Sequence, residues 1–325
     1  MKMVPETTGV LGIAISLLTV SACAPRAPLT VNPVTRSTPK GIVTNHVIVV
    51  SIDGLRPDAI RKFGASTIQR LMKTGSFTLD ARTINLSKTL PSHTSMLTGE
   101  LAEEHGIVWN TNQTDTHGTI EIPTVFSIAR QQGFHTAAFF SKTKFNHLEA
   151  EGTLDHSQAP DGKRPWSVDR TMTDVEQYLR HQRPNVLFVH IGEPDYAGHL
   201  LGWMSWLYAR AVRASDAGIA RLLRAADRAY GSDFTLILTA DHGGHGRTHG
   251  TEALEDVTIP WIAYGRGVQG GTKLPTGIRT VDTAATVLWL LGLTSTTEWT
   301  GVPVRAAFVE GAQVAADQAA AGGPR

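Results

Sequence analysis

The segment Thr239–Glu252, TADHGGHGRTHGTE, places one aspartate and three histidines among four glycines. Histidine is costly to bury and glycine loosens the chain, so a purely structural segment has little use for this mixture. Asp241 and His242 are adjacent, and in a sharp turn both can reach one ion. His249 follows a short loop later, and His245 is the competing ligand. Carboxylate and imidazole together are typical zinc ligands, so this segment predicts part of a metal site.

Five apolar, β-branched runs predict buried strands, because a strand that is covered on both faces needs no polar side. The segments between them have the spacing of amphipathic helices. Strands that alternate with helices are typical of a mostly parallel sheet with helices on both faces. We therefore expect a single α/β domain with strands at 46–53, 135–141, 185–192, 234–241 and 260–265 and helices at 67–74, 123–132, 168–181, 205–229 and 281–291.

Three of these strands end at acidic residues. Asp53 closes the first strand, Asp241 closes the fourth, and GEPDYAGH, which contains Asp195 and His199, follows the third. Parallel sheets bind ligands beyond the carboxyl ends of their strands, so we expect these side chains at one rim. Asp195 and His199 are four residues apart and would face the same side of a helical turn. Burying an unpaired carboxylate costs free energy, and a bound metal ion usually offsets that cost.

A hydroxyl-rich segment, LSKTLPSHTSMLTG at residues 86–99, supplies a candidate nucleophile. Pro91 suits the first turn of a helix that runs towards Gly99, and Thr89 lies just ahead of that helix, whose N-terminus attracts anions. The segment has no G-x-S-x-G motif, so a hydroxyl here needs another activator. A metal ion supplies one by lowering the pKa of the oxygen. The alternative is an ordinary hydroxyl-rich helix start.

Taken together, four motifs resemble those of the alkaline phosphatase superfamily, and most closely its type I phosphodiesterase/nucleotide pyrophosphatase branch. They are IDGLRP, KTLPSHTSMLTG with EEHGIVWN, EPDYAGH, and ADHGG with THG, and they occur in the family's order between Ile52 and Gly250. The resemblance implies an alkaline-phosphatase-like fold and a metal-dependent hydrolase of phosphate esters. It also implies two zinc ions per chain, in agreement with the mixed carboxylate and imidazole ligands.

The resemblance assigns a role to each matching residue. It makes Thr89 the nucleophile and Asn110 the donor to a phosphoryl oxygen. One zinc ion would be held by Asp53, Thr89, Asp241 and His242, and the other by Asp195, His199 and His249. The last histidine departs from the pattern, because it lies closer to Asp241 than in the nucleotide pyrophosphatase branch. This departure leaves the substrate less defined than the metal ligands.

The substrate expected from these motifs is a small-molecule phosphate diester or nucleotide pyrophosphate. Monoesterases of the superfamily hold an extra phosphoryl charge with a third metal or an arginine, and residues 83–110 offer no clear site of that kind. A phosphomonoesterase and a phosphonate hydrolase remain alternatives with the same chemistry. A non-enzymatic alternative is a lipid-anchored protein that binds metal or phosphate, but that function needs neither Thr89 nor Asn110.

The N-terminal residues indicate export and a lipid anchor. An apolar run at 9–20 is too short to span a bilayer, and the VSAC that ends at Cys23 resembles a bacterial lipobox. We expect a lipoprotein signal peptide at 1–22, lipidation of Cys23, a Pro-rich tether at 23–43, the catalytic domain at 44–310 and a flexible tail at 311–325. The expected location is the bacterial cell envelope, outside the cytoplasm, with membrane contact only through the lipid.

The charge of the chain argues against nucleic acid as a partner. The formal net charge is +1, and the lysines and arginines are scattered along the sequence. A nucleic-acid-binding surface would need a basic patch or stripe. The sequence leaves the oligomeric state open.

Overall fold

The computed structural model describes residues 43–162 and 165–309 of the 325-residue chain. The expected signal peptide, with Cys23, and the expected tail lie outside the described residues, as does the tether except for residue 43. The described part contains an eight-stranded sheet in the order β4-β3-β5-β1-β6-β7-β2-β8. Its strands are β1 (Val47–Ile52), β2 (Ser76–Arg82), β3 (Thr136–Phe139), β4 (His156–Gln158), β5 (Val186–Ile191), β6 (Thr235–Thr239), β7 (Thr258–Gly265) and β8 (Thr272–Lys273).

The sheet is mostly parallel, as the sequence predicts. Strand β1 pairs in parallel with β5 and β6, and β3 pairs in parallel with β4 and β5. Strand β7 runs antiparallel to both of its neighbours, β6 and β2. The five predicted strands correspond to β1, β3, β5, β6 and β7. Strand β2 was not predicted, because its residues alternate between buried and half-buried and include polar side chains.

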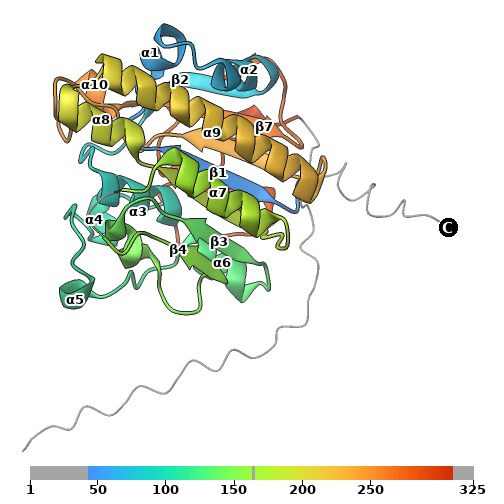
Figure 1. The fold of residues 1–325 in the computed structure, drawn as a ribbon. Coiled ribbons are helices and arrows are strands. Elements are labelled where there is room, and N and C mark those ends of the chain that lie inside the picture. Colours follow the sequence, from blue (N-terminus) through green and yellow to red (C-terminus); the bar gives the residue numbers. More distant parts are fainter. Residues whose placement is uncertain (1–42, 163–164, 310–325) are drawn as a thin grey trace, which may run out of the picture. The chain divides into compact units, whose positions relative to one another are not determined.

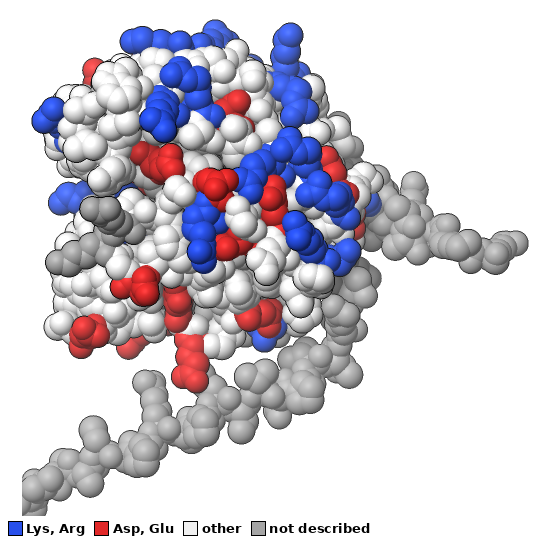
Figure 2. All heavy atoms as spheres, in the orientation of Figure 1, with Lys and Arg blue, Asp and Glu red and all other residues white. Residues whose placement is uncertain are grey.

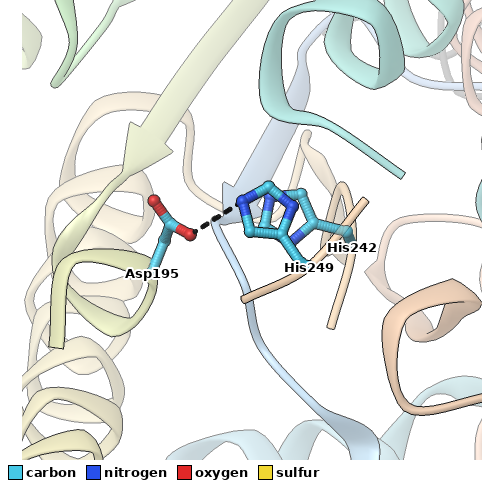
Figure 3. Close-up of side chains that lie close together, drawn as sticks. All are labelled: Asp195, His242 and His249. Atoms are coloured by element: carbon cyan, nitrogen blue, oxygen red, sulfur yellow. Dashed lines mark ion pairs between the residues drawn. The ribbon is translucent and has the colours of Figure 1, made fainter. Parts of the chain in front are cut away.

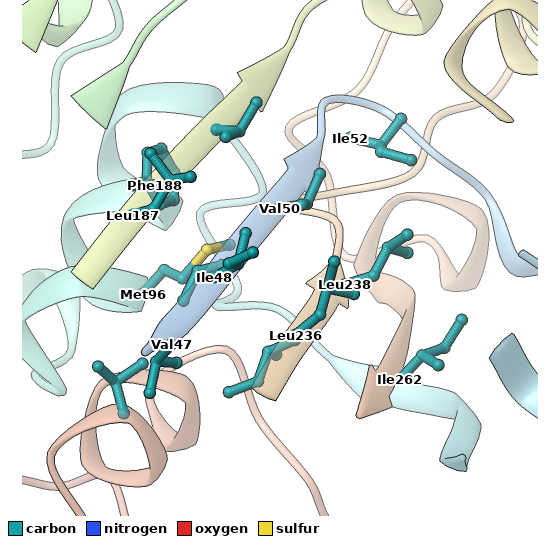
Figure 4. Close-up of a cluster of buried hydrophobic side chains, with 14 of the residues drawn as sticks. Val47, Ile48, Val50, Ile52, Met96, Leu187, Phe188, Leu236, Leu238 and Ile262 are labelled. Carbon is teal, nitrogen blue, oxygen red and sulfur yellow. The ribbon is translucent and has the colours of Figure 1, made fainter. Parts of the chain in front are cut away.

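The three central strands explain the continuous apolar runs in the sequence. Every residue of β1, β5 and β6 is buried. Figure 4 shows side chains of these strands, among them Ile48, Phe188 and Leu236, packed with Met96 of a neighbouring helix. A strand reads as apolar throughout when both of its faces are covered.

The helices pack in two groups. Their bounds are α1 (Pro57–Lys62), α2 (Ser66–Thr74), α3 (Thr89–Thr98), α4 (Ala102–His105), α5 (Thr114–His117), α6 (Val125–Gln131), α7 (Val168–Leu179), α8 (Glu193–Leu201), α9 (Trp206–Tyr230), α10 (Leu254–Val257) and α11 (Asp282–Leu290), with 3₁₀ helices η1 (Thr143–Leu148) and η2 (Arg305–Ala307). Helices α7 and α9 cross the near face of the sheet in Figure 1, and α1, α2 and α8 pack against α9. Helices α3, α6 and α11 pack against one another. Among the described helices, none combines the length and apolar character needed to span a membrane.

The long helix α9 has clear start and stop signals in its sequence. Its apolar side chains recur with helical spacing, and the Ser205 side chain accepts a hydrogen bond from the Tyr208 backbone N–H (3.3 Å). The helix ends at Gly231, whose φ of 62° lies in the left-handed region that favours glycine. These signals place Tyr208 in the first turn of α9, facing the core.

Tyr208 and Trp203 hold the turn that follows β1. The Tyr208 hydroxyl donates to the Gly54 carbonyl (2.8 Å) and accepts from the Arg56 N–H (3.0 Å), and the Trp203 indole N–H donates to the same carbonyl (3.0 Å). Gly54 has a φ of 72°, and a Cβ there would lie 3.1 Å from Asp195 Cα. Glycine is therefore required where the β1 turn passes α8.

We expect Tyr208→Phe to lower the free energy of unfolding by about 1–3 kcal/mol, because the partly buried Arg56 N–H loses its acceptor and the buried Gly54 carbonyl loses a donor. Urea denaturation followed by circular dichroism measures this change. Tyr196→Phe is the matched control, since Tyr196 on α8 is half exposed (50%), and it should change stability by less than about 0.5 kcal/mol. Equal effects of the two variants would show that the Tyr208 hydroxyl does not support the turn.

Candidate active site

The first group of candidate ligands lies at the ends of the adjacent strands β1 and β6. Nε2 of His242 is 3.3 Å from Asp53 Oδ1 and 3.2 Å from Asp241 Oδ2. All three residues are buried, and one ligand atom from each lies within 4.8 Å of the others. The Gly54 N–H donates to the other oxygen of Asp241 (3.2 Å), which fixes that carboxylate. This group contains three of the four ligands assigned to the first metal ion.

The second group surrounds Asp195 on α8. Figure 3 shows His249 facing Asp195, with His249 Nε2 3.5 Å from Asp195 Oδ1. His199 Nε2 lies 3.2 Å from the same oxygen, although the His199 side chain is 46% exposed. The rings of His242 and His249 stack with their centroids 3.6 Å apart, so the two groups are contiguous. His242, Asp195 and His249 also lie within 4.8 Å of one another by their ligand atoms.

The rings of His199, His242 and His249 are oriented in the same way, with Nδ1 towards a backbone carbonyl. Nδ1 of His242 lies 2.8 Å from the Gly243 carbonyl, Nδ1 of His249 lies 2.7 Å from the Ser87 carbonyl, and Nδ1 of His199 lies 3.0 Å from the Arg247 carbonyl. A carbonyl oxygen only accepts, so Nδ1 carries the proton and Nε2 faces the carboxylates. Backbone carbonyls orient metal-binding histidines in this way.

His245 lies outside both groups. Its Nδ1 is 2.7 Å from Oδ1 of Asp256, a buried carboxylate that also accepts from the Thr251 N–H. The geometry therefore favours His249 over His245 as the last ligand. The Asp256 contacts instead hold the loop that carries His249.

Thr89 is the first residue of α3 and lies one position further into the helix than the sequence predicts. Its Oγ1 is buried and lies 3.4 Å from Nε2 of His242. Two contacts fix α3 to the strand ends. The Ser92 hydroxyl donates to the Asp241 carbonyl (2.7 Å), and Nε2 of His93 lies 2.8 Å from the Ser51 hydroxyl. The nucleophile candidate therefore has a fixed position beside the first ligand group.

Asn110 is held beside the start of α3. Its Oδ1 accepts from the Leu90 N–H (2.9 Å) and from Nζ of Lys144 (3.0 Å). Because both bonds occupy the carbonyl end of the amide, the NH₂ group is left as a donor. This orientation suits a donor to an anionic oxygen.

Two residues near the acidic groups were not assigned a role from the sequence. Nζ of Lys142 lies 2.5 Å from Asp53 Oδ2 and 2.6 Å from Asp195 Oδ2, so it joins the two groups. Nε2 of His190, which the sequence suggests is only a strand residue, lies 3.0 Å from Asp53 Oδ2. Lys142 follows β3 and His190 lies near the end of β5. Their positions at strand ends were the signal in the sequence that could have identified them as residues of the site.

Crowded negative charge shifts the pKa values of the two aspartates that Lys142 touches. Burial raises the pKa of Asp53, but the Lys142 ammonium and the imidazoles of His190 and His242 hold it well below its usual range. Burial and the Asp53 charge raise the pKa of Asp195, but Lys142 and the imidazole of His199 bring it below the usual value. Both carboxylates are therefore ionised because cations surround them.

The pKa values of Asp241 and His242, in the first ligand group, are raised instead. Burial, followed by the Asp53 charge, raises the pKa of Asp241 to about 7. Burial lowers the pKa of His242, but Asp241 and Asp53 raise it to about 9. Burial and the charge on His242 lower the pKa of His249 to about 4. Negative charge around Asp241 thus exceeds what the neighbouring side chains compensate.

Divalent cations fit this arrangement. Asp53 Oδ1, Asp195 Oδ1 and Asp241 Oδ2 are buried oxygens without a hydrogen-bond partner among the described residues. Each points towards Nε2 of a candidate histidine ligand. Buried carboxylates are normally paired, hydrogen-bonded or bound to metal. Carboxylate oxygens and imidazole nitrogens at this spacing form a suitable donor set.

Comparison with known proteins places this site in a family. The family model for type I phosphodiesterase / nucleotide pyrophosphatase matches residues 47–257, which include all the candidate ligands. The chain belongs to this family. Its members are metal-dependent hydrolases of phosphate ester bonds with small phosphate esters as substrates, and the fold is that of the alkaline phosphatase superfamily.

Curated relatives include members of the ectonucleotide pyrophosphatase/phosphodiesterase family. Family member 1 of Homo sapiens is 25% identical over 226 residues, which cover 63% of this chain and 24% of that protein. Family member 5 of Homo sapiens is 27% identical over 219 residues, which cover 61% of this chain and 44% of that protein. The match thus spans about a quarter to under half of the length of these relatives.

Solved structures show the same fold. A murine ectonucleotide pyrophosphatase/phosphodiesterase 5 has a TM-score of 0.71 and 17% identity, and the match covers 82% of this chain and 100% of that one. A 2-O GAG sulfatase has a TM-score of 0.66 and 15% identity, with 81% of this chain and 74% of that one covered. Identities this low establish the fold alone.

We expect His249→Ala to remove one bound divalent ion per chain, because Asp195 then loses an imidazole partner. His245→Ala is the matched control in the same loop and should leave the ion content unchanged. Metal analysis by inductively coupled plasma mass spectrometry after dialysis measures both variants. Loss of an ion from His245→Ala but not from His249→Ala would reverse the choice of ligand.

Proposed function

We propose that this chain hydrolyses phosphate esters by transferring a phosphoryl group to Thr89. The observation that carries the proposal is the position of the Thr89 hydroxyl, buried at the start of α3 and 3.4 Å from Nε2 of His242. The two ligand groups are contiguous beside it. A hydroxyl among metal ligands at a helix N-terminus is suited to attack an anionic ester.

The proposed cofactor is a pair of zinc ions. Zinc suits a mixture of imidazole and carboxylate ligands better than magnesium or calcium does. One ion would be held by Asp53, Thr89, Asp241 and His242, and the other by Asp195, His199 and His249. When bound, these ions lower the pKa of a hydroxyl and offset the charge of a transferring phosphoryl group.

Thr89 acts as the nucleophile in the proposed reaction. Thr89 Oγ1 gives up its proton to solvent and bonds to phosphorus while the bond from phosphorus to the leaving oxygen breaks, and that oxygen takes a proton from solvent. Water then attacks phosphorus and loses a proton, the bond to Thr89 breaks, and Thr89 Oγ1 takes up a proton again. The NH₂ group of Asn110 donates to a non-bridging oxygen, which carries more charge in the transition state than in the ester.

The relatives support the proposal. The names of the curated relatives combine nucleotide pyrophosphatase and phosphodiesterase activity. The murine structure is of an inactive variant in which alanine replaces a threonine, and it is a complex with AMP. These names support a threonine nucleophile and a small phosphate ester or pyrophosphate as substrate. The non-enzymatic alternative gains no support from a family of hydrolases.

We expect Thr89→Ala to lower kcat at least about a thousandfold, because the attacking oxygen is removed. Zinc content should stay near the wild-type value, since the carboxylate and histidine ligands remain. Thr89→Ser is the control that keeps the hydroxyl and should retain measurable turnover. The assay follows release of p-nitrophenol from its phosphate esters. Turnover by Thr89→Ala within tenfold of wild type would rule out Thr89 as the nucleophile.

We also propose that Cys23 carries a lipid that anchors the chain in the bacterial cell envelope, outside the cytoplasm. The support is the apolar run at 9–20 followed by VSAC. In cells grown with radiolabelled palmitate, the wild-type chain should incorporate label and Cys23→Ser should not. Equal labelling of the two chains, or none in the wild type, would contradict this anchor.

A further inference from the structure

Two lysines enter the candidate site shortly after the end of β3. The sequence there is FSKTKF, in which Lys142 lies in the connection to η1 and Lys144 lies in the first turn of η1. Strand β3 lies next to β5 and parallel to it, so its carboxyl end meets the rim that also holds Asp53 and Asp195. Neither lysine belongs to the motifs that define the ligands and the nucleophile.

Each lysine contacts a different part of the site. Nζ of Lys142 lies between Asp53 Oδ2 (2.5 Å) and Asp195 Oδ2 (2.6 Å), and its side chain is only 13% exposed. Nζ of Lys144 lies 3.0 Å from Oδ1 of Asn110, the amide that is oriented to donate to a phosphoryl oxygen. The Lys142 ammonium group therefore lies between the two ligand groups. The Lys144 ammonium group lies beside Asn110, the proposed hydrogen-bond donor to a phosphoryl oxygen.

The neighbouring residues fix the path of this segment. A Cβ added to Gly192 would come within 2.6 Å of Ser141 Oγ, so glycine leaves room for Ser141 directly before Lys142. The Ser141 hydroxyl lies 2.7 Å from Nδ1 of His190. On either side of the two lysines, the rings of Phe140 and Phe145 stack at 5.0 Å between centroids. A surface lysine has no need of such support.

Most of the other basic side chains lie on the outside of the molecule. Figure 2 shows lysines and arginines spread over the visible face, interspersed with acidic residues. A lysine held among buried carboxylates, as Lys142 is, is both oriented and shielded from water. Lys144 is half-buried and is held by the Asn110 side chain, so both lysines differ from the exposed basic residues.

The charge balance of the site indicates what the lysines are for. Three carboxylates and a deprotonated Thr89 carry four negative charges, which two divalent ions offset when the histidines are neutral. The two lysines then add two positive charges. A diester phosphate brings one negative charge and leaves the cluster positive, whereas a terminal phosphoryl group brings two and balances it. Uncompensated buried charge is unfavourable, so the doubly charged group fits better.

We propose that Lys142 and Lys144 form an anion-holding pair that makes this chain selective for a terminal, doubly charged phosphoryl group over a singly charged diester. The proposal rests on phosphoryl transfer to Thr89 and specifies its substrate class. It also supplies the charge-holding group that residues 83–110 lack, from a part of the chain that only the fold brings to the site. A phosphate monoester and a nucleotide with a terminal phosphate share this chemistry.

The test compares kcat/KM for p-nitrophenyl phosphate and bis-p-nitrophenyl phosphate in the zinc-loaded protein. We expect the wild type to favour the monoester at least tenfold. Lys144→Gln should lose about tenfold to a hundredfold in kcat/KM for the monoester, the range for a hydrogen bond to a charged group, and less than about threefold for the diester. Lys144→Arg keeps the charge and should keep most of the preference. Lys73→Gln, on the exposed side of α2, is the control and should change neither rate.

A second readout is binding of inorganic phosphate and of dimethyl phosphate, measured by calorimetry without turnover. Lys144→Gln should weaken phosphate binding at least tenfold and leave dimethyl phosphate unchanged. Lys142→Gln should act in the same direction, and its melting temperature shows whether it still folds. Release of phosphate from ATP and from AMP, compared with hydrolysis of p-nitrophenyl phosphate, distinguishes nucleotides with a terminal phosphate from simple monoesters.

Two results would overturn the lysine proposal: a wild type that favours the diester, or a Lys144→Gln variant that loses both rates equally with phosphate binding unchanged. A failure of the hydrolase proposal looks different. The wild type would then turn over neither ester, and phosphate binding by Lys144→Gln would still decide the role of the lysines.

Discussion

Three carboxylates at the ends of strands β1, β5 and β6 set the conditions that the rest of the site must meet. The strands are adjacent and parallel, so Asp53, Asp195 and Asp241 converge at one buried rim. Their repulsion is severe in a medium of low dielectric constant. Histidine Nε2 atoms and the Lys142 ammonium lie next to these carboxylates and reduce their repulsion, and the same side chains form a donor set that suits two divalent ions. Burial together with this negative charge raises the pKa of Asp241, and the charges of Asp241 and Asp53 outweigh burial and raise the pKa of His242.

Hydrogen bonds to backbone groups convert this charged cluster into a defined geometry. Carbonyls hold Nδ1 of His199, His242 and His249, so that Nε2 of each ring faces a carboxylate. Ser92 and His93 attach α3 to the ends of the central strands and thereby place Thr89. The carbonyl of Gly54, in the turn after β1, accepts hydrogen bonds from both Trp203 and Tyr208. A nucleophile needs such prior positioning, because a misplaced attacking group loses much of its advantage.

Much of the site was predictable because its residues follow strand ends. The strands are apolar, the acids come directly after them, and Asp195 and His199 are spaced for one face of a helix. The sequence already preferred His249 over His245 as the last ligand, and the structure agrees, since His249 faces Asp195 and His245 faces Asp256. Lys142 was missed for another reason. Its partners, Asp53 and Asp195, are 89 and 53 residues away, and only the order of β3, β5 and β1 brings it between them. Strand β2 was missed because its buried positions include the polar residues Ser76 and Thr78, whereas the apolar Phe77 and Leu79 are only half-buried.

The lysines also explain how one family fold can differ in substrate class while keeping its ligands. Ligand residues follow the central strands β1, β5 and β6, whereas Lys142 and Lys144 follow the neighbouring strand β3. On the lysine proposal, the charge that Lys142 and Lys144 add determines which phosphoryl group balances the site.

Anomalous diffraction at the zinc edge from zinc-grown crystals would show whether two cations balance the buried carboxylates. We expect two anomalous peaks, one within ligand distance of Asp53, Asp241 and His242 and the other within ligand distance of Asp195 and His249. A single peak, or zinc bound only at His245 and Asp256, would show that two cations do not bind there.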